Sequence, residues 1–175
     1  MKSSSFNVEN KCAKAGIAQF LKETFGKDIP VLVCIGTDAV IGDSLGPLVG
    51  SLLEEKLNGK TFIYGSFASP ITAREIEPLV KFIKAVHPDK KVLAIDAAVG
   101  KQEEIGSIKL IDRPLKPGAG VEKNLSEIGD ANVIGVMAEK CVEAGKLGFV
   151  RLSRVYRVAK VIVDGINAYI LSATA

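Results

Sequence analysis

Apolar and polar residues follow two different patterns along this chain. Short apolar runs rich in valine and isoleucine predict buried strands, at residues 31–35, 61–64, 91–95, 107–111 and 132–137. Longer stretches in which apolar residues recur every three or four positions predict helices, at residues 10–25, 45–57, 72–86 and 149–172. Strands and helices follow one another, and an extra pair of strands follows Asp96. We therefore expect an α/β fold, a three-layer α/β/α sandwich around a mixed, mostly parallel sheet.

The last predicted helix has one apolar side and one charged side. At about 100° per residue, one arc collects the apolar residues Leu152, Val155, Val158, Ala159, Ile162, Ile166 and Tyr169. The opposite arc collects Ser153, Arg154, Arg157, Lys160 and Asp164. The basic residues could form a stripe that binds nucleic acid, but a solvated outer face is the favoured interpretation.

Length and composition indicate a single globular domain. The 175 residues allow a sizeable core, and only residues 1–8 are expected to be frayed. The net charge of +3 is too small to indicate nucleic acid or an acidic membrane surface as a partner. Three scattered cysteines without CxxC spacing argue against disulfides and zinc. Because no stretch resembles a signal peptide or a membrane helix, we expect a cytoplasmic protein.

The clearest chemical signal lies between the strand predicted at 31–35 and the helix predicted after Ser44. The intervening loop holds two carboxylates, Asp38 and Asp43, among three glycines. Ligand and catalytic groups of open α/β sheets collect where strands end and lead into helices. This loop is therefore the first candidate for a functional site.

A second candidate carboxylate, Asp96, directly follows the strand predicted at 91–95. If this strand neighbours the strand before Asp43, the two carboxylates converge at one edge of the sheet. Repulsion between close carboxylates raises one pKa, so that one group acts as an acid while the other acts as a base. The same pair could instead ligate a divalent metal, or each aspartate could cap a helix or a loop. The residues alone leave these alternatives open.

Other familiar catalytic motifs are missing from the sequence. The glycines around Asp43 have neither the GxGxxG spacing of a dinucleotide site nor that of a phosphate-binding loop. Ser44 and Ser66 lack the GxSxG turn of a serine hydrolase. The single histidine, His87, is expected to end a helix, where its partial positive charge suits the helix dipole.

Four sequence blocks resemble the YyaC-like sporulation proteins. They follow one another over about residues 30–170, and they are Gly36-Thr-Asp-Ala-Val-Ile-Gly-Asp43-Ser-Leu-Gly-Pro47, Leu93-Ala-Ile-Asp96-Ala, Lys116-Pro-Gly-Ala-Gly-Val121 and Ile128-Gly-Asp130. That family is similar to the core of germination protease, the endopeptidase that degrades small acid-soluble spore proteins. It is more distantly similar to the hydrogenase maturation endopeptidases, which have a three-layer α/β sandwich fold.

The resemblance implies that Asp43 and Asp96 are the catalytic pair of an endopeptidase. Its substrates would be spore or sporulation proteins, small acid-soluble spore proteins among them, in the cytoplasm of a sporulating bacterial cell or in the spore core. The hydrogenase endopeptidases bind nickel through two carboxylates and a later histidine. Because no histidine follows His87 here, we expect neither a metal nor another cofactor.

The remaining expectations concern partners. Asp38 and the loop residues Pro117, Gly118 and Gly120 are expected to contact a protein or peptide substrate, the loop through backbone N–H groups that small residues leave accessible. A catalytically inactive binding or scaffold protein of the same fold is the alternative. Neither reading involves nucleic acid or membrane, and a homo-oligomer stays open.

Overall fold

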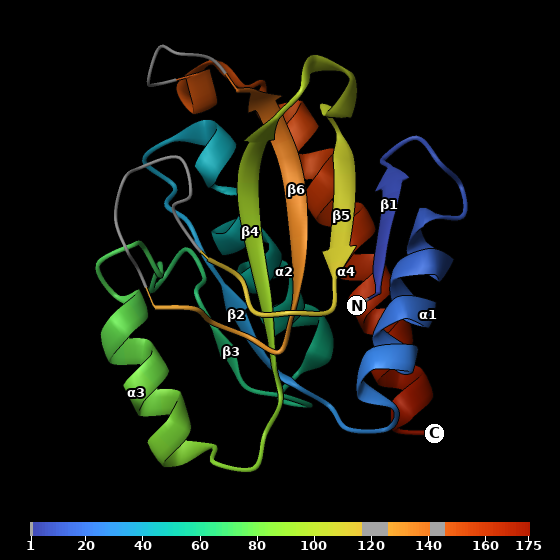
Figure 1. The fold of residues 1–175 in the computed structure, drawn as a ribbon, viewed down its shortest axis with the longest axis vertical. Coiled ribbons are helices and arrows are strands. Elements are labelled where there is room, and N and C mark those ends of the chain that lie inside the picture. Colours follow the sequence, from blue (N-terminus) through green and yellow to red (C-terminus); the bar gives the residue numbers. More distant parts are fainter. Residues whose placement is uncertain (1, 117–125, 141–145) are drawn as a thin grey trace.

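A single six-stranded sheet forms the centre of the molecule, with strand order β1-β5-β6-β4-β2-β3 (Figure 1). The computed structural model describes residues 2–116, 126–140 and 146–175. The strands are β1 (Ser3–Asn7), β2 (Val31–Cys34), β3 (Ile63–Tyr64), β4 (Val92–Gly100), β5 (Ser107–Ile111) and β6 (Ala131–Glu139). The α-helices are α1 (Ala13–Phe25), α2 (Leu45–Leu57), α3 (Ile76–Val86) and α4 (Leu152–Ala173). Three short 3-10 helices are η1 (Ile41–Asp43), η2 (Gln102–Glu104) and η3 (Lys146–Phe149).

The sheet is mixed and mostly parallel. β2 pairs in parallel with β3 and β4, and β4 pairs in parallel with β6. Only β5 runs against its neighbours β1 and β6. Residues of α1, α2 and α4 form one core on one face of the sheet, while α3 forms a smaller core on the other face (Figure 1). The α/β prediction with a mixed sheet is therefore confirmed.

Helix α2 approaches β2 so closely that only glycine fits at the contact. A Cβ atom on Gly46 would lie 2.0 Å from the carbonyl oxygen of Ile35. A Cβ atom on Gly50 would lie 1.9 Å from the carbonyl oxygen of Gly65, which follows β3. Real Cβ atoms do not come that near to a backbone oxygen, so these glycines allow helix and sheet to touch. The start of α2 is thereby held directly above the end of β2.

Strand β4 is longer than the sequence pattern predicts. The apolar run suggested a strand at 91–95 that ends at Asp96, whereas β4 continues through Asp96 to Gly100. The prediction was wrong because β6 pairs with β4 from Leu93 to Gly100, with Asp96 opposite Ile134. Asp96 therefore lies inside a strand.

The amino-terminal segment is ordered, contrary to the prediction. Residues 1–8 were expected to be frayed, yet Ser3–Asn7 forms the edge strand β1, paired antiparallel with β5. The ring of Phe6 covers Gly16 of α1, where a Cβ atom would lie 2.2 Å from that ring. Backbone pairing and one aromatic contact order a segment that has no strand pattern of its own.

Helix ends also differ from the predicted positions. α3 begins at Ile76 instead of residue 72, because the carboxylate of Glu75 accepts the N–H of Thr72 at 2.9 Å and closes a turn before the helix. In α4, six of the seven residues predicted to face inward are buried, but Leu152 is 61% exposed.

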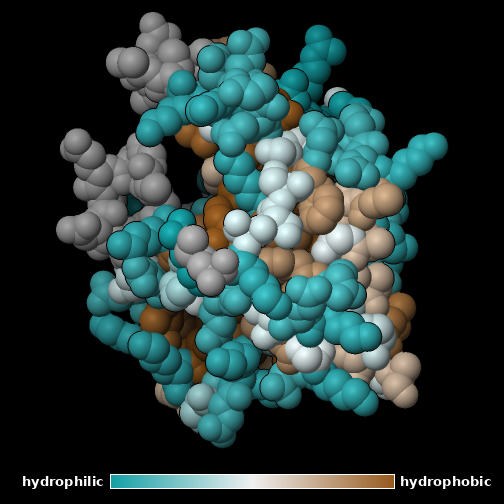
Figure 2. All heavy atoms as spheres, turned by 45° about the vertical axis from the view of Figure 1, so that its right-hand side comes forward, coloured by the Kyte–Doolittle hydropathy of each residue, from teal (hydrophilic) through white to brown (hydrophobic). Residues whose placement is uncertain are grey.

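The charged side of α4 is occupied by contacts within the chain. Arg157 pairs with Glu9 at 2.7 Å, Lys160 pairs with Asp164 at 3.7 Å, and Arg154 donates to the carbonyl oxygen of Met137 at 3.3 Å. Figure 2 shows hydrophilic residues over much of the face on the β1 side, with apolar ones exposed between them. Among the described helices, none has both the length and the apolar character needed to cross a membrane.

Candidate active site

The backbone around Asp43 is held against the end of β2. Gly36 follows the strand with φ +141°, and a Cβ atom there would lie 2.0 Å from the carbonyl oxygen of Asp43. The N–H of Thr37 donates to that same oxygen at 3.2 Å. The hydroxyl of Ser44 donates to the carbonyl of Ile41 at 2.7 Å, which secures the single turn of η1. Asp43 is therefore half-buried at a defined place between β2 and α2.

Asp96 lies where β2 stops and β4 continues. The last β2–β4 pair is Cys34 with Ile95, and the N–H of Ile35 still donates to the carbonyl of Ile95 at 2.8 Å. Asp96 is therefore the first residue of β4 beyond the end of β2. Its Oδ1 accepts the N–H of Ala97 at 2.8 Å. The predicted convergence of the two carboxylates at this edge of the sheet follows from the strand order.

The charge of Asp43 affects the ionisation of Asp96. Burial, as the largest cause, and the charge of Asp43 together raise the pKa of Asp96 to about 8, against a lowering effect of the Ala97 N–H. Burial also raises the pKa of Asp43, while the backbone N–H of Thr37 lowers it. Protein surrounds the Asp96 carboxyl closely, although the residue keeps some solvent access. A carboxyl group with a pKa of about 8 carries its proton at neutral pH.

The pair therefore has the means for acid–base chemistry. Asp96 can donate a proton at neutral pH, and Asp43 can accept one when it is ionised. Two titratable groups whose environments separate their pKa values are a mark of functional sites, although ion-pair networks also perturb pKa values. Among the described residues, no Lys or Arg contributes to either pKa shift, so no ion-pair network in this part of the chain accounts for the raised pKa values.

Of the other predicted site residues, the structure describes only Asp38. Asp38 is exposed in the turn between β2 and η1. Pro117, Gly118 and Gly120 lie outside the described residues. Their proposed contact with substrate stays a prediction.

His87 directly follows α3, before the chain enters β4. Its Nε2 and the hydroxyl of Tyr64 are 2.8 Å apart, and the residue is buried. Asp130, from the fourth sequence block, accepts the N–H of Val92 at 2.8 Å and thereby fastens the beginning of β4. Within the described ranges, no three His, Cys, Asp or Glu residues gather as a metal-ligand group.

Two backbone groups that act on the aspartates were not predicted from the sequence. They are the N–H groups of Thr37 and Ala97, and any residue except proline supplies such a group. One signal was available for Ala97: the residues after Asp96 are Ala-Ala-Val-Gly, which continue the apolar run and indicate a longer strand.

Comparison with known proteins identifies the family but no activity. A family model described as a protein of unknown function (DUF1256) matches residues 5–165. The chain is also 38% identical over 152 residues to the uncharacterised protein YyaC of Bacillus subtilis (strain 168). That match covers 86% of this chain and 74% of the relative. The chain therefore belongs to the DUF1256 family.

Proposed function

We propose that this protein is an endopeptidase in which Asp43 and Asp96 activate water against a peptide bond. The observation that carries the proposal is the raised pKa of Asp96, to about 8, at a position where Asp43 adds to the shift. An acid with a raised pKa near a second carboxylate, where the neighbouring strand β2 ends, is suited to hydrolysis without a nucleophilic side chain.

The two aspartates take different roles in this mechanism. Burial raises the pKa of Asp43, and the N–H of Thr37 acts against that rise and favours the ionised form. Ionised Asp43 removes a proton from water as the oxygen attacks the carbonyl carbon of the scissile amide. Protonated Asp96 gives its proton to the amide nitrogen as the C–N bond breaks. The products are a carboxylic acid and an amine, which ionise to a carboxylate and an ammonium ion, and the proton taken up by Asp43 passes to Asp96 to restore the pair.

The substrate class rests on the sequence resemblance. Asp43 and Asp96 both lie in blocks that resemble germination protease, so the proposed substrates are spore or sporulation proteins, cut in a sporulating cell or in the spore core. Asp38, exposed beside η1, and the loop with Pro117, Gly118 and Gly120 are the proposed substrate contacts.

The decisive experiment is incubation of the protein with acid-soluble protein extracted from bacterial spores, followed by mass spectrometry of the fragments. Asp43→Asn and Asp96→Asn should each reduce cleavage by about a hundredfold or more, because asparagine keeps the shape but cannot transfer the proton. The double variant should be no slower than the slower single variant, because residues that act as a unit are not additive.

The exposed aspartate Asp89 provides the matched control, since Asp89→Asn removes a carboxylate that no step uses. If either single variant at the pair cuts as fast as the wild type, the aspartate mechanism is wrong. A catalytically inactive binding or scaffold protein would then be the better account.

A further inference from the structure

Among the strands that the structure describes, none pairs with one side of β4 beside the aspartate pair. β4 continues past the end of β2 through Ala97 and Val99 to Gly100, and there it pairs only with β6. Figure 1 shows β4 and β6 extending beyond β2. η1 contacts β6 as well as β4; since β6 lies on the far side of β4, η1 lies over a face of these strands and not in line with the sheet.

The hydrogen-bonding direction of this segment follows from its neighbours. The carbonyls of Lys91 and Ile95 accept N–H groups from the β2 side. The carbonyls of Val92 and Gly100 accept N–H groups from the β6 side. Backbone groups alternate along a strand, so the N–H and C=O of Val99 and the C=O of Ala97 point away from β6. Within the described residues, no other chain segment takes the place of β2 there.

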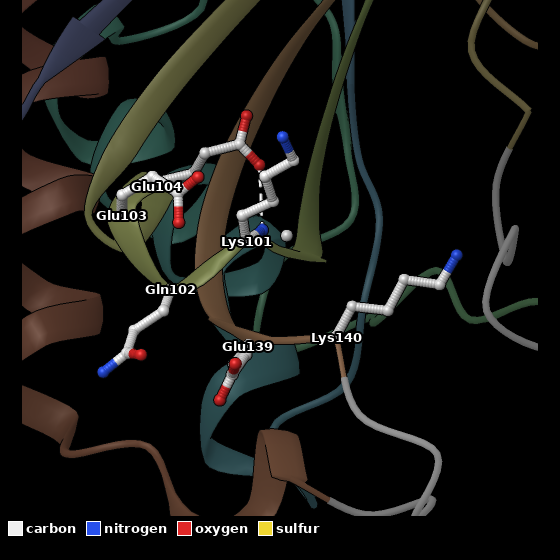
Figure 3. Close-up of a pocket in the computed structure, with 7 residues that line it drawn as sticks. Lys101, Gln102, Glu103, Glu104, Glu139 and Lys140 are labelled. Carbon is white, nitrogen blue, oxygen red and sulfur yellow. Dashed lines mark hydrogen bonds between the residues drawn. The ribbon is translucent and has the colours of Figure 1, made fainter.

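The side chains along this edge leave it accessible. Residues 96–100 are half-buried, and alanine, valine and glycine follow Asp96. An open pocket of about 590 Å³ starts at Gly100, between η2 and the end of β6 (Figure 3). Lys101, Glu103 and Lys140 are among the charged and polar residues that line it. A chain running along the edge would thus pass the aspartates and reach a pocket suited to a polar side chain.

We propose that the free edge of β4 at Ala97–Gly100 binds the substrate polypeptide as an added strand. The occupant is an extended, unfolded stretch of chain, because only an extended backbone can pair with a strand edge over several residues. Pairing would be independent of most of the substrate's sequence and would hold its backbone next to Asp43 and Asp96. This inference rests on the proposed peptidase activity for its substrate, and it predicts that folded proteins are not cut.

The first test replaces the free N–H. Val99→Pro removes a backbone donor that β6 does not use, and proline is tolerated on strand edges that face away from a partner. Loss of one or two backbone hydrogen bonds should slow cleavage of the acid-soluble spore extract by about tenfold. Val99→Ala loses more apolar surface but keeps the N–H, so it should cut clearly faster than the proline variant. Circular dichroism and melting temperature establish that each variant is folded.

The second test leaves residues 97–100 of β4 unchanged. Asp96→Asn, which binds without cutting, is mixed with the same extract, and deuterium uptake is measured by mass spectrometry. Peptides that contain residues 97–100 should take up less deuterium with the extract than without it, because an added strand would slow exchange of the Val99 amide several-fold.

The outcomes separate this inference from the proposed activity. Equal cleavage by wild type and a folded Val99→Pro, or unchanged exchange at residues 97–100 while the wild type cuts the extract, would overturn the edge as the binding site. Protection without any cleavage by the wild type would support the edge and reject the peptidase. Absence of both would reject both. If Val99→Pro does not fold, the exchange measurement decides.

Discussion

Asp96 occupies a costly position for a charged group. Burial is the largest cause of its raised pKa, and the charge of Asp43 adds to it, while only the N–H of Ala97 favours the ionised form. An apolar side chain would fit a nine-residue strand better than a carboxyl group does. Sites that keep such a group commonly gain activity at the expense of stability, which is consistent with the acid role proposed for Asp96.

The raised pKa predicts how stability depends on pH. An unfolded aspartate titrates near pH ~3.9, and folded Asp96 titrates at about 8. Between these values the folded state holds a proton that the unfolded state has released. The contribution of Asp96 to the free energy of unfolding is therefore full below the lower pKa and falls by up to about 1.4 kcal/mol per pH unit as pH rises towards 8.

Asp96→Asn removes this dependence, since asparagine stays neutral and can still accept the Ala97 N–H. The variant and the wild type should have similar stability near pH 4, and the variant should become progressively more stable up to about pH 8. Denaturant unfolding of both proteins at each pH measures the difference. A difference that stays constant over this range would contradict the raised pKa.

At the scale of elements, the contact between α2 and the sheet places Asp43. Gly46 and Gly50 let the helix lie directly on the backbone at the ends of β2 and β3. Gly36 lets the chain leave β2 with positive φ and pass beneath the carbonyl of Asp43. These three glycines thus fix the separation between α2 and β2, and with it the position of Asp43, the proposed general base.

Gly50→Ala tests this arrangement. Alanine should favour the helix itself by about 1 kcal/mol, but its Cβ would meet the carbonyl oxygen of Gly65 at 1.9 Å. Because a backbone oxygen cannot rotate away, we expect the free energy of unfolding to fall by about 2–3 kcal/mol.

Denaturant unfolding measures this effect, with Glu55→Ala as the control. Glu55 is exposed on the same helix, so its replacement should change stability by less than about 0.5 kcal/mol. A stabilised Gly50→Ala variant would show that α2 can move off the sheet without loss.

At the scale of the whole molecule, the sheet joins distant parts of the chain. β1, from the amino terminus, pairs with β5 over five residues, and Phe6 packs against α1. α1 and α4 share the larger core. The amino-terminal strand therefore covers an edge that would otherwise expose β5.

Deletion of residues 2–7 should lower the free energy of unfolding by about 2 kcal/mol. The deletion removes the backbone pairing with β5 and exposes the surface of α1 that Phe6 covers. Replacement of Ser3 and Ser5 by alanine is the control, because their exposed side chains leave the backbone pairing intact. Thermal and denaturant unfolding compare the three proteins. An unchanged stability after the deletion would mean that the segment is frayed, as its sequence suggests.

The sequence by itself determined the class of fold and both aspartates of the candidate site. Apolar runs and helical spacing are local properties, so four helices and the central strands could be predicted from them. Asp43 and Asp96 could be identified because each follows a strong apolar run. The pairing that orders β1 and the N–H groups that contact the carboxylates could not be predicted in this way, and the apolar residues after Asp96 only indicated that β4 runs past it without showing how far. They depend on which strands become neighbours: β6 carries β4 past Asp96, β5 orders a serine-rich segment, and β2 ends where β4 does not. Pairing between residues far apart in the chain decided these features, because backbone hydrogen bonds leave no mark on side-chain pattern.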